Sequence, residues 1–156
     1  MALYRSHGFT PQIGQISWSD VRNALKKNAI AVELFQYSEY NSDKSDLIEY
    51  YGALVIKHNS DIPVFTKLCK AADINNLIAK GSKIYSVDGL LYDLLWTPLS
   101  VHMKGMKDIY ISPQGELHKV NFSAIKDSKG NPLYKIHNIH RVSSTGNITK
   151  DYKTSV

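Results

Sequence analysis

A run of apolar residues at positions 29–37 places the strongest constraint on what this chain folds into. It reads Ala-Ile-Ala-Val-Glu-Leu-Phe-Gln-Tyr, so β-branched or aromatic side chains stand at both odd and even positions. Successive side chains of a strand point to opposite faces, and this segment therefore favours a strand that is covered on both faces. We expect it to lie inside a sheet.

A second apolar run, residues 50–57, follows a polar stretch at 41–46 that is rich in turn-forming residues. Two strands in this order pair most simply as an antiparallel hairpin. The length of the polar stretch predicts a long loop between them. The sheet is thus expected to contain at least these two strands.

Three more segments are predicted to be strands. Residues 108–112 form the first, and Pro113 and Gly115 then occupy positions typical of a tight turn. Residues 117–120 follow as a return strand, which would make a second hairpin. The last strand is predicted at 133–144, where the apolar spacing is mixed.

Three segments have the apolar spacing of helices. The first begins with Ser17 and Asp20, which stand at the spacing of a capping box. The second covers residues 63–81 as one helix or two short ones, with a Pro in its first turn and a Gly at its exit. The third covers 87–105, and Pro98 is expected to kink it or to end its first part.

The order helix, hairpin, helices, strand, hairpin, strand favours an α/β sandwich of a mixed sheet with helices. A chain of 156 residues, 43% of them hydrophobic, fits one globular domain with a core of its own. We divide it into a leader or linker at 1–16, the domain at 17–145 and a flexible tail at 146–156.

The composition of the chain limits the expected cellular location and the expected classes of partner. Cys69 is the single cysteine, so no disulfide forms within the chain, and no signal peptide or spanning segment is evident. We therefore expect a cytoplasmic location and no membrane contact. The net charge is +5, but the lysines are dispersed and no basic patch is interleaved with aromatic residues, so a nucleic-acid partner is not expected.

Several segments together resemble the start of CHAT domains, which are caspase-like modules related to separase. The resemblance covers roughly residues 17–145. Its most specific part is the Ser-Pro-Gln-Gly-Glu-Leu stretch at 112–117, followed by Phe122 and Ala124. The shorter matching pieces occur in the family's order; they are 18–21, 31–37, 51–56, 91–99 and 142–145.

The resemblance implies a caspase-like fold, commonly attached to tetratricopeptide-type helical repeats, with a His and a Cys as the peptidase dyad. In the family both dyad residues lie downstream of the segment that this chain resembles, in a His-Gly context and after a later strand. Neither motif occurs here. No residue inherits a catalytic role, and no cofactor or metal is expected.

Two functions follow as hypotheses. The first is the non-catalytic amino-terminal portion of a CHAT-family cysteine peptidase domain, which supplies sheet scaffold for a downstream His/Cys dyad. The second is a self-contained protein–protein interaction module, a degenerate CHAT fragment without peptidase activity. Expected partners are the remainder of the parent domain and its helical-repeat region, and unpaired sheet edges would also allow a homodimer.

Cysteine and histidine are the residue types that could supply a nucleophile or a metal ligand. Cys69 stands in a predicted helix beside Leu68 and Lys70, which favours a packing residue over a nucleophile. A three-residue offset on a strand would point His137 and His140 to opposite faces, which disfavours a metal site built from that pair. The remaining histidines, expected to be solvent-facing or hydrogen-bonded, are His7, His58, His102 and His118.

Glu33 is the one charged residue inside the run at 29–37. A buried carboxylate must be paired or hydrogen-bonded, so we expect a structural bond from a Trp indole or a turn amide rather than a catalytic role. Trp18 and Trp96 are candidates for a binding platform, but aromatic residues beside helical apolar stripes are more often part of the core.

Overall fold

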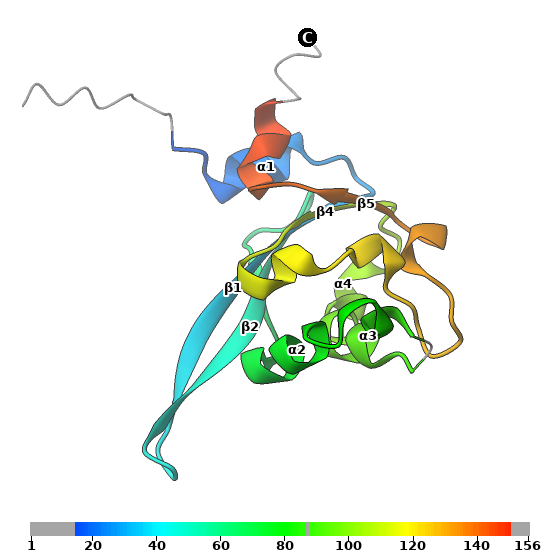
Figure 1. The fold of residues 1–156 in the computed structure, drawn as a ribbon. Helices are drawn as coiled ribbons and strands as arrows, with labels where there is room; N and C mark the ends of the chain where they lie inside the picture. Colours follow the sequence, from blue (N-terminus) through cyan, green and yellow to red (C-terminus); the bar gives the residue numbers. More distant parts are fainter. Residues whose placement is uncertain (1–14, 87, 151–156) are drawn as a thin grey trace, which may run out of the picture.

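The structure, a computed structural model, describes residues 15–86 and 88–150 of the chain. Five strands form one mixed sheet with helices on both faces, so the predicted α/β class is confirmed (Figure 1). The strands are β1 (Ala29–Asn41), β2 (Asp46–Lys57), β3 (Val64–Lys70), β4 (Asp108–Ser112) and β5 (Asn138–Arg141).

The strand order in the sheet is β3-β2-β1-β4-β5. β1 pairs with β2 and β2 with β3 in antiparallel fashion, whereas β1 pairs with β4 and β4 with β5 in parallel. The strand at 29–37 was expected inside the sheet, and β1 is indeed its central strand. The sheet therefore has an antiparallel half and a parallel half that meet at β1.

The β1–β2 hairpin is confirmed, but its loop is short. The pairing continues to Asn41 opposite Asp46, which leaves only residues 42–45 between the strands. Polar residues that were predicted to form a loop therefore extend the pairing of β1 with β2, because main-chain hydrogen bonds between strands do not require apolar side chains. Figure 1 shows this ribbon projecting from the body of the molecule.

The prediction of helix over 63–81 is wrong in its first half. Residues Val64–Lys70 form β3, and the helix α2 begins only at Ala71 and ends at Ile78. β3 lies at the edge of the sheet, and Cys69 is its one fully buried side chain. An edge strand with so few buried residues lacks the alternation that identifies a strand, and the apolar spacing there matched a helix by chance.

The crossover from β3 to β4 covers one face of the sheet. It contains α2, α3 (Leu90–Leu95), a 3-10 turn at Thr97–Leu99 and α4 (Ser100–Met103). Pro98 stands in that 3-10 turn and separates the two α-helices, as predicted. Leu91, Leu95 and Leu99 point into the core from this layer.

The predicted return strand at 117–120 is also wrong. A 3-10 helix, Gly115–Lys119, takes its place. Leu117 and Val120 are both buried, and a spacing of three brings side chains to one side of a 3-10 helix. Both edges of β4 are already paired, with β1 and β5, so no hairpin partner has room beside it. Gly115 does adopt the expected left-handed conformation, with φ +59°.

The last predicted strand, 133–144, is confirmed only at its centre. Leu133–Lys135 forms a 3-10 turn, and β5 covers Asn138–Arg141. A short 3-10 turn at Phe122–Ala124 precedes it in the connection from β4. Leu133 and Phe122 fill the same core as α2–α4, so this connection covers the same face of the sheet.

A second, smaller core lies on the opposite face. The helix α1 (Trp18–Ala24) packs there with the last described turns (Figure 1). Its predicted capping box between Ser17 and Asp20 is present. The residues of this core are Val21, Leu25, Ala29, Ala31, Ile56 and Ile148. A flexible tail was expected from residue 146, but Ile148 is 7% exposed and packs on the sheet. Residues 151–156, and 1–14 of the expected leader, lie outside the described residues.

Candidate functional site

Glu33 stands where the parallel ladder between β1 and β4 ends. Ser112, the last residue of β4, is its register partner. The Ser112 hydroxyl donates to Glu33 Oε1 at 2.6 Å. The main-chain N–H and the hydroxyl of Thr145 donate to Glu33 Oε2 at 3.0 and 2.7 Å. The carboxylate thus joins three segments that are far apart in the sequence.

The expected bond from a turn amide to Glu33 is confirmed, and the donor is Thr145 rather than a Trp indole. Thr145 opens a 3-10 turn, Thr145–Asn147, that follows β5. Ser112 and Thr145 were not identified from the sequence. Ser and Thr carry no local signal for a partner that is 79 or 112 positions away.

A pocket of about 500 Å³ opens beside Glu33 on the α1 face of the sheet. Its apolar wall consists of Ile16, Trp18, Val21, Leu54, Ile56 and Pro63. Glu33 and the turn at 144–147 form its polar side. A mostly apolar pocket of this size with a few convergent polar groups is typical of small-ligand sites.

The position of the pocket agrees with a general rule for open α/β sheets. Ligands tend to bind outside the carboxyl ends of strands, at the point where the strand order reverses. Here β2 and β3 lie on one side of β1, and β4 and β5 on the other. Glu33 and Ser112 stand at the carboxyl end of the parallel pairing between β1 and β4, beside that point.

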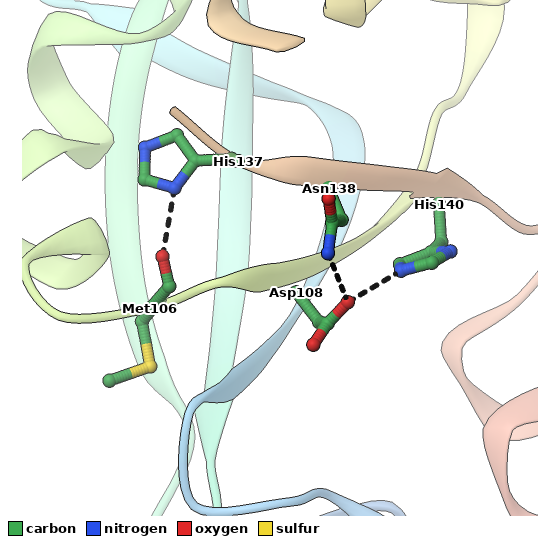
Figure 2. A network of polar contacts seen from close by, with 5 residues as sticks. All are labelled: Met106, Asp108, His137, Asn138 and His140. Carbon is green, nitrogen blue, oxygen red and sulfur yellow. Dashed lines mark hydrogen bonds and ion pairs between the residues drawn. The ribbon is translucent and has the colours of Figure 1, made fainter. Parts of the chain in front are cut away.

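A second polar cluster lies at the opposite ends of β4 and β5 (Figure 2). Asp108 Oδ1 accepts hydrogen bonds from Asn138 Nδ2 at 3.2 Å and from His140 Nε2 at 2.9 Å. The bond from His140 is the main cause that lowers the pKa of Asp108 below its usual value, and the Asn138 bond adds to it. This cluster ties the edge strand β5 to β4.

His137 and His140 belong to different sides of the sheet, as their three-residue offset predicts. His137 Nδ1 donates to the Met106 carbonyl at 2.8 Å (Figure 2). The His137 ring lies 5.7 Å from the ring of the core residue Trp96. The His140 ring stacks on Tyr110, which packs against the smaller core. Within residues 15–86 and 88–150, no group of three or more His, Cys, Asp or Glu side chains is arranged to hold a metal ion.

Cys69 lies in β3 rather than in the predicted helix. It is 8% exposed, and burial, with a further contribution from the charge of Asp73, raises the pKa of its thiol to about 12. A thiol in this environment is protonated at neutral pH and is a poor nucleophile. The geometry therefore agrees with a packing role.

The other histidines are hydrogen-bonded. His58 Nδ1 donates to the Leu25 carbonyl, His102 Nε2 lies 3.0 Å from the Thr66 hydroxyl, and His118 contacts Arg141. Burial lowers the pKa of His102. His7 lies outside the described residues.

The two tryptophans have different environments. Trp96 is 2% exposed and belongs to the main core, as expected of an aromatic residue beside an apolar stripe. Trp18 is 36% exposed and lines the pocket, and the Arg22 guanidinium lies 5.2 Å from the centre of its ring. Of the two, only Trp18 is therefore available to a ligand.

Comparisons of the chain with protein-family models, with curated proteins and with solved structures gave no match. In the described part of the chain, every helix is too short or too polar to traverse a bilayer.

Proposed function

We propose that this chain is the non-catalytic amino-terminal portion of a CHAT-family caspase-like cysteine peptidase domain. In this role it supplies a sheet platform on which a downstream segment, with the His and the Cys of the dyad, is built. The proposed location is the cytoplasm, and the proposed partners are the remainder of the domain and a helical-repeat region.

The observation that carries the proposal is the outer edge of β5. The amides of Asn138 and Val142 donate to carbonyls of Lys107 and Ile111, on the β4 side. Since main-chain groups alternate along a strand, the amides of Ile139 and Arg141 point away from β4. Because β1, β4 and β5 are already parallel, this edge is suited to receive another strand and to extend the parallel half of the sheet.

The stretch at 112–117 supports a scaffold role in a second way. The main-chain N–H of Gln36 donates to Gln114 Oε1 at 2.8 Å, and the main-chain N–H of Glu116 donates to the Tyr51 hydroxyl at 3.2 Å. A Cβ on Gly115 would stand 3.1 Å from that hydroxyl. The turn after β4 is therefore held against β1 and β2. These contacts explain Gln114 and Gly115 without any catalytic role.

The same edge favours the second candidate, a self-contained interaction module. A partner strand that pairs with β5 in trans would use the same outward amides. The two candidates differ in the source of that strand: a downstream segment of the parent protein in the first, and an unrelated protein in the second.

The test begins with the reading frame that follows Val156 in the natural transcript. A strand followed by His-Gly, and later a strand followed by Cys, is expected there. Coexpression of that downstream segment with this chain is then expected to give a complex with peptidase activity that thiol reagents inhibit. Neither piece alone is expected to hydrolyse a peptide.

A matched pair of variants tests the edge itself. Arg141→Pro removes the outward amide together with the guanidinium, whereas Arg141→Ala removes only the guanidinium, including its contacts with His118. We expect Arg141→Pro to weaken complex formation by about tenfold relative to Arg141→Ala. Equal binding by the two variants, or a reading frame that encodes neither dyad motif, would contradict the peptidase proposal.

A further inference from the structure

We propose that the pocket beside Glu33 binds a positively charged group carried on an apolar stem, such as an alkylammonium ion or a lysine side chain. This inference does not depend on the proposed peptidase scaffold. It rests on the charge of Glu33, on the apolar wall opposite it and on the place of the pocket in the sheet.

The first argument concerns charge. Three donors bind the Glu33 carboxylate, namely the Ser112 hydroxyl and the amide and hydroxyl of Thr145, and all three are uncharged. Hydrogen bonds from neutral donors hold a carboxylate in place without removing its net charge. Among the described residues that line the pocket, Glu33 is the one charged residue, so the charge that a ligand contacts directly there is negative.

The second argument concerns unused bonding capacity. A carboxylate offers about four acceptor sites, and these three bonds occupy three of them. Among the described residues, Ser112 alone donates to Oε1. Glu33 is partly exposed rather than buried, so a ligand reaches it through the pocket. A cationic donor in this place would form a charge-assisted hydrogen bond, which is stronger than one from a neutral donor.

The third argument concerns the wall. Ile16, Trp18 and Leu54 are exposed large hydrophobic residues that face a shared cavity. They offer apolar contact to a stem several carbons long. The Trp18 ring already carries the guanidinium of Arg22. The cationic end of a ligand is therefore directed to Glu33, and its stem to the wall.

The full chain labelled with 15N is suited to the test, because its two tryptophans report on different places. Titrations with n-hexylammonium, n-hexanol and hexanoate compare three charges on one stem. We expect a saturable shift of the Trp18 indole and Thr145 amide signals with hexylammonium, about tenfold tighter than with hexanol. The Trp96 indole signal is expected to stay in place, because Trp96 lies in the other core.

Two variants separate charge from shape. Glu33→Gln is expected to weaken hexylammonium binding by about tenfold, while Glu39→Gln, a change in the same strand at a carboxylate paired with Lys67, leaves it unchanged. Gly146→Leu fills the pocket instead. A Cβ at Gly146 would lie 3.5 Å from Ile16, an ordinary contact, so this variant is expected to fold and to lose binding. It decides the question if Glu33→Gln fails to fold.

A further arm distinguishes the source of the ligand. A capped tripeptide with a central lysine is titrated beside hexylammonium, and tighter binding of the peptide assigns the pocket to a protein partner, whereas tighter binding of the amine assigns it to a small molecule. Equal affinity for hexanol and hexylammonium would overturn the proposal. So would full affinity in Gly146→Leu, or pocket signals that shift with protein concentration alone, which would place a second copy of the chain there.

Discussion

At the level of single residues, the hydrogen bonds of Glu33 contribute to the stability of the sheet. A half-buried carboxylate loses part of its hydration, and the loss is offset only while its donors stay in place. Ser112 is 3% exposed, so water does not readily replace its hydroxyl. The bond that it donates therefore matters more than a bond at the surface.

We expect Ser112→Ala to lower the free energy of unfolding by about 1.5–3 kcal/mol, because a bond to a charged acceptor is lost at a buried place. Urea denaturation at neutral pH measures it, with an unchanged m-value as the sign that the unfolded state is the same. The matched control is Ser100→Ala, which removes an exposed hydroxyl bonded to the Thr97 carbonyl. That control is expected to stay within about 0.5 kcal/mol of the parent chain. An equally small effect of Ser112→Ala would contradict the argument.

The sequence identified Glu33 but not its partners, and the reason is physical. A charge within an apolar strand stands out locally, and the rule that buried charges must be bonded then predicts a donor. Which residue donates depends on how β4 and the turn after β5 come to lie beside β1. That arrangement is a property of the whole sheet, so Ser112 and Thr145 had no signal of their own.

At the scale of elements, the pair β4 and β5 is expected to respond to acid. The pKa of Asp108 is lowered in the folded state, chiefly by the hydrogen bond from His140. A lowered pKa means that the charged form is favoured by folding. Its contribution to stability is complete above the usual value of 3.8 and is lost as the pH falls through the lower folded-state value.

We therefore expect the free energy of unfolding to decrease as the pH is lowered below about 4. The decrease is expected to be less steep in Asp108→Asn. Urea titrations at a series of acidic pH values give the slopes. Glu39 and Asp127 also have lowered pKa values, so some slope is expected to remain in the variant. His140→Ala removes the main cause and should reproduce part of the flattening. Identical slopes in Asp108→Asn and the parent chain would contradict the prediction.

The elements that were predicted correctly are those whose local pattern and burial agree. β1 and β2 are apolar over their buried halves, and the kink at Pro98 follows from a missing amide. The predictions for β3 and for residues 115–119 are wrong for opposite reasons. β3 pairs at an edge and buries little, whereas Leu117 and Val120 are fully buried but lie within and directly after a 3-10 helix. A buried segment without the two-residue period of a strand lacks the sequence pattern that identifies its backbone conformation. A paired strand with few buried side chains lacks that pattern too.

At the scale of the whole molecule, the two layers on the sheet are unequal. The face with α2, α3 and α4 holds the larger core, to which β1, β2, β3 and β4 all contribute. Among the described residues, the core on the α1 face contains six buried side chains. Stability within one fold is not uniform, and an element held by few buried apolar contacts opens at a lower free energy. The α1 layer is therefore expected to open before the sheet and the helices on its other face.

Ile148→Ala tests this order. Ile148 contributes to the smaller core, and its truncation is expected to lower the opening free energy of the α1 layer by about 2 kcal/mol or more. Native-state hydrogen exchange reads it at the Leu25 amide, which donates to the Val21 carbonyl at the end of α1. The Trp96 amide, which donates to Tyr92 in the other layer, reports on the main core. Its protection is expected to fall by a similar amount, because unfolding of the main core includes the opening of the α1 layer.

The reciprocal variant, Ile74→Ala in α2, removes a side chain that is fully buried in the main core. Because the main core stays folded when the α1 layer opens, this variant is expected to lower protection at the Trp96 amide and to leave protection at the Leu25 amide unchanged. The asymmetry between the two variants is the signature of a layer that opens by itself. Equal losses at both amides in Ile74→Ala would instead mean that the two faces of the sheet unfold as one cooperative unit.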